Sequence, residues 1–334
     1  MDPISQGVVG AVIGGASQPQ KHTKIALLSG AFAGMSADID VLISSSADPL
    51  LFLEYHRQFT HSLAFIPFGA AICTVLIAMF TDPRISRTRL YLCCLLGFAS
   101  HGLLDACTTY GTQLFWPFSS ERVAWNIISI VDPLFTLPLC ALTWIAYRQK
   151  NPRWLHAALI WIAIYLSFGI MQHHRANNIG EQLALDRQHH PVRLESKPGF
   201  ANLLVWKTVY EWQGYFYVDA VRAGLTEEVY PGSKAAKVNV QRHFPSLRSN
   251  QQQTIDIERF RRFSNDYLAW QPAHADRIID VRYSMLPNEI NPLWHIRVDR
   301  ENPDQHVEFV TNRQGNTKTL QRLWSLITGK AVAN

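Results

Sequence analysis

The sequence lacks the cysteine pattern of a metal-binding finger and the basic stripe of a nucleic-acid-binding protein. Its five cysteines all lie in apolar segments, and none belongs to a CxxC pair. Free cysteine is among the most buried residue types, so we interpret all five as small apolar side chains. The 31 Lys and Arg residues outnumber the 26 Asp and Glu residues by only five and are not clustered. Because phosphate binding requires clustered cations, we expect no nucleic-acid partner.

The first residues also lack the basic start of a secretory signal. Asp2 stands where such a signal carries Lys or Arg. We therefore expect the apolar residues 4 to 16 to remain in the protein. From residue 173 onward the chain has no cysteine, so this polar half needs no disulfide bond.

Charged residues are absent or rare in four apolar runs of the first half. Each run approaches the roughly 20 residues that cross a bilayer. The runs are residues 63 to 80, 90 to 110, 127 to 147 and 154 to 171. Two shorter stretches, residues 4 to 16 and 25 to 37, are expected to be tilted or re-entrant. The sequence predicts a mainly α protein, with a polytopic α-helical membrane domain over residues 1 to 172, a linker over 173 to 198 and a small soluble α+β domain over 199 to 334.

The basic residues of the predicted membrane domain lie in alternate loops. Positive loops face the cytoplasm, so these loops indicate one orientation. Their basic residues are Lys21, Lys24, Arg84, Arg87, Arg89, Arg148, Lys150 and Arg153. The intervening loops hold only Arg57 and Arg122. We therefore predict that the C-terminal domain lies outside the cytoplasm.

Seven ionisable residues fall at one predicted depth, near the outer membrane interface. They are Asp38, Asp40, His56, His61, His101, Asp105 and Asp132. Charged groups in membrane segments are costly and usually mark functional sites. His101 and Asp105 are four residues apart, so a helix places them on one face. Mixed His and Asp ligands suit zinc or another first-row divalent ion. One ion with supporting carboxylates and a pair of ions both remain open.

Each of these residues also has an ordinary explanation. A His–Asp pair one helical turn apart can satisfy its own hydrogen bonds, and "DID" can end a helix in water. "HRQFTH" can contact lipid head groups, and Asp132 before Pro133 can cap a helix. The metal-site hypothesis therefore rests on the prediction that these residues lie on the same side of the membrane and at the same depth.

The order of five short motifs adds a family resemblance. "MDP", "SADID", "HRQFTHS", "SHGLLDACTTYGTQLFWPFS" and "IVDP" follow one another within residues 1 to 150. They resemble the LexA-regulated, inner-membrane-bound metal-dependent hydrolases of bacteria. The resemblance implies a hydrolase of the bacterial inner membrane with a divalent-metal centre. It implies His56, His61, His101 and Asp105 as the strongest ligand candidates, with Asp38, Asp40 and Asp132 next. Where the family usually has a histidine after its opening MDP, this chain has Gln6, which implies a smaller site or a ligand carbonyl.

The predicted activity is metal-assisted hydrolysis of a lipid or lipid-linked substrate. A bound ion, most simply zinc, would lower the pKa of a coordinated water. Asp40 or Asp132 would act as general base, and Arg57 would bind a phosphate or carboxylate. Gln6, Thr60, Ser62, Thr109 and Tyr110 would orient ligands or substrate by hydrogen bonds. Intramembrane His and Asp residues also build ion pathways, so an ion- or proton-coupled transporter competes with the hydrolase, as does a catalytically degenerate membrane scaffold.

Residues 199 to 334 mix strand-like and helix-like patterns. "NLLVWKTVYEWQGYFYVDAVRAG" predicts two strands around Gly214, and "RIIDVRYSM", "LWHIRVDR" and "HVEFVTN" predict further strands. "QQTIDIERFRRFSNDYLAW" and "TLQRLWSLITG" predict helices, the second ending at Gly329. No motif in this half indicates a role.

Overall fold

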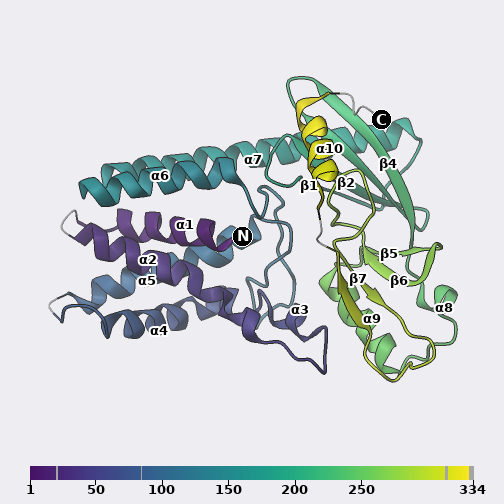
Figure 1. Ribbon diagram of the computed structural model, residues 1–334, viewed down its shortest axis with the longest axis horizontal. Helices are drawn as coiled ribbons and strands as arrows, with labels where there is room; N and C mark the ends of the chain where they lie inside the picture. The colour runs from purple at the N-terminus through teal and green to yellow at the C-terminus, as the bar shows by residue number, and fades with distance from the viewer. Residues whose placement is uncertain (20–21, 84, 313–314, 331–334) are drawn as a thin grey trace. The chain divides into compact units, whose positions relative to one another are not determined.

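The computed structural model describes residues 1–19, 22–83, 85–312 and 315–330 (Figure 1). The chain forms two compact units. The helical unit comprises Met1–Ile43 and Tyr55–Ile170, and the sheet unit comprises Ser44–Glu54 and Met171–Asn334. Lys21 and Arg84, two of the basic residues that indicate the orientation, lie outside the described residues.

The helical unit is a bundle of helices (Figure 1). Its main helices are α1 Pro3–Ala16, α2 Thr23–Ser36, α4 Ile66–Ala78, α5 Arg87–Ala106, α6 Pro133–Gln149 and the first part of α7, Arg153–Asp186. The shorter elements are η2 Ala37–Leu42, α3 Leu51–Tyr55, η3 Phe59–His61 and η4 Leu63–Phe65. Helix α1 packs against α2, α5 and α6, while α5 also packs against α2 and α4. Helices α1, α2 and α5 therefore form the centre of the bundle.

Three glycines allow α1, α2 and α5 to pack backbone to backbone. A Cβ added at Gly10 or at Gly97 would collide with the carbonyl oxygen of Gly30. Small residues at such crossings are typical of helices that associate within a membrane. The close packing fixes the end of α2 beside α5, where the ionisable residues lie.

The prediction of a polytopic α-helical membrane domain is wrong. Within the described residues, two helical stretches are long and apolar enough to cross a membrane, Thr23–Leu42 and Arg153–Asp186. A third would require Leu51–His61 and Leu63–Ala78, bent by 55°, to count as one span. The run predicted at 25 to 37 is thus longer than expected, because η2 continues α2.

Two of the predicted spans fail for physical reasons. Helix α5 begins at Arg87, contains Arg89 and carries Asp105, so its mean hydropathy is low. The run from 127 to 147 yields only the 17-residue α6, because Asp132 caps that helix and Pro133 is its first residue. A side-chain cap and a proline at the first position both mark a helix start. The apolar residues before Asp132 therefore do not extend the helix.

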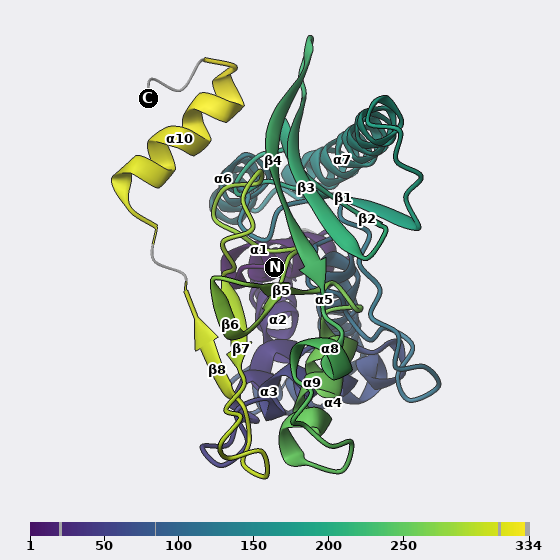
Figure 2. The ribbon, with the colours of Figure 1, turned by 90° about the vertical axis from the view of Figure 1, so that its right-hand side faces the viewer.

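Within its described residues, the sheet unit contains eight strands, each paired antiparallel with the next in sequence order. They are β1 Arg193–Pro198, β2 Val205–Trp212, β3 Tyr215–Ala223, β4 Glu227–Lys237, β5 Leu268–Gln271, β6 His274–Asp280, β7 Trp294–Arg297 and β8 Glu308–Thr311. Helices α8 Val240–His243, α9 Gln252–Phe263 and α10 Thr317–Thr328 belong to the same unit. The helix predicted to continue to Trp270 ends at Phe263, and its last residues instead belong to β5. Figure 2 shows the long β3–β4 hairpin and the twist of the sheet. The predicted small α+β domain is therefore an extended antiparallel sheet with helices attached, and this part of the fold prediction is also wrong.

The predicted hairpin around Gly214 is confirmed. Gln213 and Gly214 have φ values of 48° and 75°, and they connect β2 to β3. Two consecutive positive φ values are typical of the tight turn that suits twisted antiparallel strands. The core on one side of this hairpin includes Val209, Phe216 and Val218 with Ile279. Helix α10 packs its Leu323 and Leu326 against a second apolar cluster.

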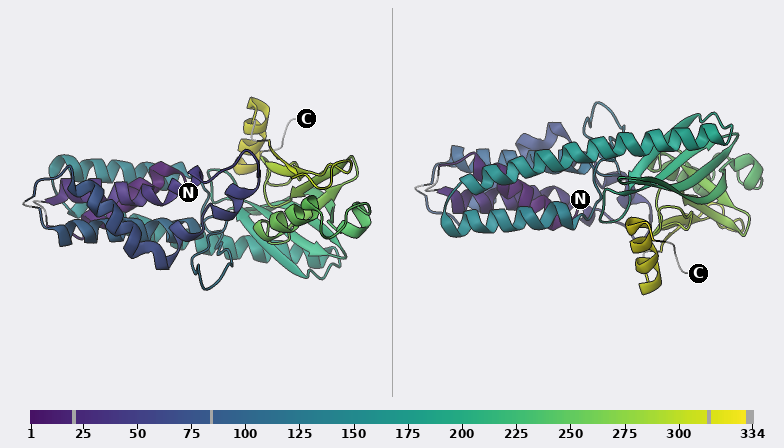
Figure 3. Two further views of the ribbon diagram at one scale, coloured as in Figure 1. Left: turned by 90° about the horizontal axis from the view of Figure 1, so that it is seen from below. Right: turned by 90° about the horizontal axis from the view of Figure 1, so that it is seen from above.

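Helix α7 is one continuous helix of 34 residues (Figure 3). Its residues from Met171 onward belong to the sheet unit. There Gln172 donates to the carbonyl oxygens of Leu203 and Ala223, at 2.9 and 2.7 Å. Helix α7 continues to Asp186 and β1 begins at Arg193, so most of the segment predicted as a linker is regular structure.

The sheet unit also includes residues 44 to 54, which immediately precede the predicted site residues His56 and Arg57. Arg259 of α9 binds this segment through Asp48 and Glu54, at 2.8 and 2.6 Å. The ring of Phe52 meets that of Phe309 edge to face. The segment is thus fixed to α9 and β8.

Two buried lysines face each other across the β1–β2 pair. Lys197 is the register partner of Lys207, and both side chains are buried. The Lys207 Nζ donates to the Ser284 hydroxyl and to the Glu289 carbonyl oxygen, at 2.8 and 2.6 Å. Neither partner carries a negative charge, so burial dominates and lowers the pKa of Lys207 from 10.5 to about 7.

We therefore expect the stability of the sheet unit to rise with pH. Between about pH 7 and 10.5 the unfolded chain keeps the Lys207 proton that the folded chain has released. The free energy of unfolding should then increase by about 1.4 kcal/mol per pH unit over this window. Denaturant titrations of the wild type and of Lys207→Met between pH 6 and 10 measure this. The difference in the free energy of unfolding between the two proteins should shrink as the pH rises. A difference that does not change with pH would contradict a Lys207 side chain that is buried and loses its proton in this range.

Candidate metal centre

Six of the seven predicted ionisable residues come together in the helical unit. Asp38 and Asp40 lie on η2, directly after α2, while His101 and Asp105 lie one turn apart on α5. His56 and His61 lie on the segment between α3 and η4. Their carboxylate and imidazole atoms form two groups, each with its atoms within 4.8 Å of one another. One group is Asp38, His61, His101 and Asp105; the other is Asp38, Asp40 and His56.

Four ligand atoms of the first group lie close together. The Nε2 atoms of His61 and His101 are 2.9 Å apart. Asp38 Oδ1 lies 3.5 and 3.3 Å from these nitrogens, and Asp105 Oδ2 lies 3.3 and 3.7 Å from them. The side chains of His61, His101 and Asp105 are fully buried, whereas that of Asp38 is 26% exposed. The group is therefore enclosed except on the side of Asp38.

The other ring nitrogens determine which atoms are free to bind a metal. His101 Nδ1 is 2.5 Å from the Gly34 carbonyl oxygen, an acceptor, so this nitrogen donates its proton. His61 Nδ1 is 3.2 Å from Asp40 Oδ2, which likewise requires a donor. In the neutral rings both Nε2 atoms then carry lone pairs. With both rings neutral, two lone pairs and two carboxylate oxygens face one another, an arrangement that a cation among them, a metal ion or a proton, stabilises.

This arrangement fits a divalent ion. Ligand atoms about 2.0–2.1 Å from a zinc ion at the corners of a tetrahedron lie about 3.3 Å apart. The spacings around the two nitrogens, from 2.9 to 3.7 Å, are close to that value. Metal-binding histidines usually donate their second N–H to a carboxylate or a backbone carbonyl, as His61 and His101 do here. Asp105 Oδ2 makes no hydrogen bond of good geometry among the described residues, although it is ion-paired with Arg57 Nε at 3.0 Å.

Asp40 organises the second group. Its Oδ1 accepts from His56 Nδ1 at 2.9 Å, and its Oδ2 accepts from the Arg57 backbone N–H and the Thr60 hydroxyl, both at 2.9 Å. His56 is the most open member, with 29% of its side chain exposed. Since Asp38 belongs to both groups, the six residues could hold one ion or two ions that share Asp38.

Arg57 supplies a buried positive charge beside the first group. Its Nε lies 3.0 Å from Asp105 Oδ2, and its Nη1 donates to the Thr108 hydroxyl at 3.1 Å. The guanidinium also lies 5.2 Å from the centre of the Tyr110 ring. The φ of Arg57 is +62°, in the left-handed region that few side chains adopt. The packing therefore imposes this conformation, which directs the backbone N–H to Asp40.

The comparison with known proteins assigns the family. The family model described as YdjM inner membrane protein matches residues 1–176, which is more than half of the chain. The chain belongs to this family. The match covers the segments that carry all six clustered residues, and the resemblance seen in the motifs is confirmed.

Two curated relatives match parts of the chain. It is 31% identical to the uncharacterized protein YfhP of Bacillus subtilis over 150 residues, 44% of this chain and 45% of YfhP. It is 34% identical to the inner membrane protein YbcI of Escherichia coli over 111 residues, 31% of this chain and 61% of YbcI. The chain thus spans between about half and three-fifths of these relatives. No solved structure matches it.

The remaining predicted site residues take varied positions. Gln6, which stands in place of the family's usual histidine, donates to Asp105 Oδ1 at 2.9 Å. Asp132 belongs to neither group: it caps α6 and accepts from the Tyr165 hydroxyl at 2.8 Å. Ser62 caps η4. Thr109 is buried and Tyr110 half-buried, next to Thr108 on the chain.

Several contacts of the centre involve residues without ionisable side chains or residues far away in sequence. The Met1 amino group is buried and contacts Asp105 Oδ1. A Cβ at Gly102 would collide with the His61 carbonyl oxygen. Arg122 donates to the His56 carbonyl oxygen at 3.2 Å. Met1 and Gly102 lie within the motifs "MDP" and "SHGLLDACTTYGTQLFWPFS", but nothing in either pattern indicates these contacts.

An apolar groove leads to the centre. It has a volume of about 510 Å³ and is lined by Phe32, Met35, Ser36, Ile39, Phe59, Thr60, Phe65, Gly69, Ile72, Cys73, Leu76 and Phe98. Thr60 connects the two features, because its hydroxyl bonds to both Asp40 and His61 Nδ1, each at 2.9 Å. Ile39 lies between Asp38 and Asp40 on η2. The metal centre therefore adjoins a hydrocarbon-lined surface.

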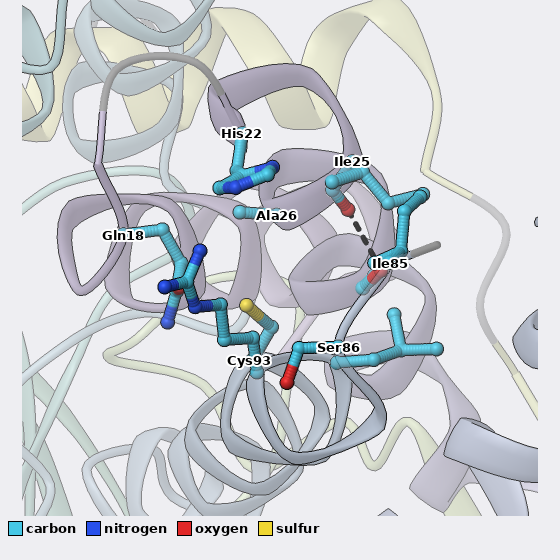
Figure 4. Close-up of a pocket in the computed structure, with 10 residues that line it drawn as sticks. Gln18, His22, Ile25, Ala26, Ile85, Ser86 and Cys93 are labelled. Atoms are coloured by element: carbon cyan, nitrogen blue, oxygen red, sulfur yellow. Dashed lines mark hydrogen bonds between the residues drawn. The ribbon is translucent and has the colours of Figure 1, made fainter. Parts of the chain in front are cut away.

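A second cavity of the helical unit is too small to be an active site. It lies among residues of the α1–α2 segment and the start of α5, including Gln18, His22, Ser86 and Cys93 (Figure 4). Its volume of about 10 Å³ holds about one water molecule. The hydroxyl of Ser29, which also lines it, is bound to the Ile25 carbonyl oxygen at 2.7 Å.

Proposed function

We propose that this protein is a membrane hydrolase that depends on a divalent metal, most simply zinc. The observation that carries the proposal is the convergence of two histidine lone pairs and two carboxylate oxygens, from Asp38 and Asp105, in a nearly enclosed site. A structural His–Asp pair would place a proton between a nitrogen and an oxygen. Here the Nδ1 protons of both neutral rings are directed elsewhere, to the Gly34 carbonyl and to the Thr60 hydroxyl beside Asp40.

Each residue of the centre has its own role in the proposed reaction. A divalent ion supplies Lewis acidity and lowers the pKa of a water to about 7. His61 and His101 bind through Nε2, and Asp38 and Asp105 bind through carboxylate oxygens. Asp40 orients His61 and His56 and accepts too many hydrogen bonds to serve well as a base. His56, held by Asp40 through Nδ1 and partly exposed, is the group best placed to accept a proton at Nε2.

Arg57 acts in this scheme chiefly as a counter-charge. Its side chain is 4% exposed and already contacts Asp105 and Thr108. It therefore balances the carboxylates when the ion is absent and limits the charge of the filled centre. Asp132, engaged with Tyr165, has no part in the chemistry that we propose.

The apolar groove supports an amphiphilic substrate. A lipid or lipid-linked molecule would place its hydrocarbon chain between α2 and α4 and its polar bond near Thr60 and Asp38. Burying a methylene group contributes about 0.8 kcal/mol, so a chain in the groove contributes substantially to binding. Membership in an inner-membrane family supplies the environment in which such substrates are abundant.

Filling the groove tests this substrate class. Ile72 and Val75 lie on the same helix with 55% and 63% of their surface exposed, but only Ile72 lines the groove. We expect Ile72→Trp to lower kcat/KM for a long-chain phospholipid about tenfold or more, through the loss of several buried methylene groups. Val75→Trp should leave this kcat/KM unchanged, and neither variant should change kcat/KM for a short-chain analogue. Equal losses for both variants would contradict the groove.

The activity itself is tested with the chelated protein. Detergent-purified chain is stripped with EDTA, reloaded with Zn²⁺, Mn²⁺ or Mg²⁺, and supplied with phospholipids and with soluble phosphate mono- and diesters. We expect hydrolysis of at least one substrate by the reloaded protein and none by the stripped protein. Metal loading that restores no hydrolysis of any of them would overturn the proposal.

The orientation remains part of the proposal. The basic residues Lys24, Arg87, Arg89, Arg148, Lys150 and Arg153 support an outer location of the sheet unit. A phosphatase reporter fused after the C-terminal residue should be active, and a fluorescent reporter that matures only in the cytoplasm should be dark. The reverse pattern would place the sheet unit inside.

A further inference from the structure

The sheet unit contains a cleft that the proposed hydrolase chemistry does not use. Its volume is about 990 Å³, and it lies between the β2–β3 turn, the end of β4, α8 and the β5–β6 hairpin. Its lining includes three cationic side chains, two imidazoles and two large aromatic rings. They are Lys234, Lys237, Arg242, His243, His274, Tyr215 and Trp270.

The charge of the cleft is of one sign. Among the described residues that line it, none is Asp or Glu. Lys237 is paired with Glu211 and Asp266, at 2.9 and 2.6 Å. By contrast, Lys234 and Arg242 form no ion pair within the described part of the chain, and both are exposed. Two unpaired cations beside one cleft favour an anionic group of a ligand.

The aromatic rings provide flat surfaces next to these cations. His243 stacks on Trp270 with their rings 4.5 Å apart and inclined by only 7°. The Trp270 Nε1 donates to the Ala275 carbonyl oxygen at 3.2 Å, which fixes the indole. Lys234 lies 5.0 Å from the centre of the Tyr215 ring. Such amphipathic rings present an apolar face to a ligand that also makes polar contacts.

Side-chain amides complete the lining. Gln213, Gln271 and Asn291 border the cleft, and each amide offers both donors and an acceptor. Hydroxyl groups are the natural partners of amides, and the apolar face of a sugar ring is the natural partner of an indole. Cations in the same cleft select for a sugar that carries carboxylate or phosphate.

We propose that this cleft binds an anionic saccharide, with a sugar ring against Trp270 and its acidic group near Lys234 and Arg242. The site is independent of the metal centre. Saccharides of this class occur on bacterial envelope polymers, and the cleft is wide enough for more than one ring. The sheet unit would then recognise a carbohydrate, and the helical unit would carry the metal chemistry.

Calorimetry on the full-length, detergent-purified chain tests the proposal with three probes. Tri-galacturonate offers both rings and carboxylates, maltotriose offers rings alone, and tripolyphosphate offers charge alone. We expect binding of tri-galacturonate, with maltotriose and tripolyphosphate each weaker by about tenfold or more, since the first lacks the charge-assisted hydrogen bonds and the second lacks the ring contacts.

Variants locate the binding. Lys234→Gln and Arg242→Gln, both at exposed positions, should weaken tri-galacturonate binding about tenfold each. Trp270→Leu should weaken it as well, whereas Lys318→Gln and Trp324→Leu, on exposed residues of α10, should not. Tripolyphosphate or maltotriose binding as tightly as tri-galacturonate, no binding of tri-galacturonate, or binding that survives both charge variants would each overturn the proposal.

Discussion

Replacing His61 with alanine should remove the divalent metal from the purified protein and abolish metal-dependent hydrolysis. His61 Nε2 contacts every other member of the first group: His101 at 2.9 Å, Asp105 at 3.3 Å and Asp38 at 3.5 Å. The imidazole is fully buried, so water cannot easily take its place. Loss of a residue that only orients a ligand costs about 10–100-fold in metal affinity, and loss of a ligand costs more.

Elemental analysis by mass spectrometry measures the effect as metal ions per chain. The wild type should carry one or two, and His61→Ala well below one. The metal content of Asp40→Asn should lie between those of the wild type and His61→Ala, because Asp40 only orients His61 and His56. His156→Ala provides the control, since His156 is an exposed histidine of α7 in the same unit. If His61→Ala kept the full metal content, the assignment of the first group would be wrong.

Part of this centre could be predicted from the sequence because its geometry is local. His101 and Asp105 share one face of α5 through helical periodicity alone. The placement of Asp38 and His61 beside them required a second argument, from the side and depth of the predicted segments. That argument brought the right residues together although several of its spans were wrong. This is because composition shows where an apolar segment ends, even when the segment is too short or too charged to cross a membrane.

The contacts that the sequence did not predict depend on tertiary structure. Arg57 was expected to face a substrate, yet its guanidinium is buried against Asp105. The cause is its left-handed backbone, with φ at +62°, which no pattern of side chains reveals. The Gly34 carbonyl that orients His101 is likewise a backbone atom brought near by the packing of α2 on α5.

The size of the sheet was missed for a related reason. Strands β2, β3 and β7 contain the β-branched and aromatic residues that mark strands. Strand β4, "EEVYPGSKAAK", instead contains proline and glycine and has only one buried residue, and β1 is rich in charge. Both are held by pairing with neighbours rather than by their own pattern. Elements that depend on their partners in this way cannot be recognised one at a time.

Removing the charge of Arg57 should destabilise the helical unit more than any single change at its surface. Its guanidinium is 4% exposed and the carboxylate of Asp105 is fully buried. Breaking one partner of a buried ion pair costs about 3–5 kcal/mol. Here the Met1 amino group and Gln6 still contact Asp105 Oδ1, whereas Oδ2 loses the guanidinium. We therefore expect Arg57→Met to lower the Tm of the metal-free protein by about 10 °C, measured by thermal unfolding in detergent.

A double-mutant cycle separates this charge effect from the loss of packing. Arg57→Met keeps a long apolar side chain at the same backbone position, so the energetic cost of the positive φ is unchanged. If the uncompensated Asp105 is the cause, Asp105→Asn in the Arg57→Met background should restore part of the lost Tm, although Asp105→Asn alone also lowers it. Arg153→Met, at an exposed position of α7, should have little effect. Additive losses in the cycle would show that the two charges act independently. Because a bound divalent ion compensates Asp105 in the same way, metal should also protect Arg57→Met more than the wild type, which links the fold of the centre to its occupancy.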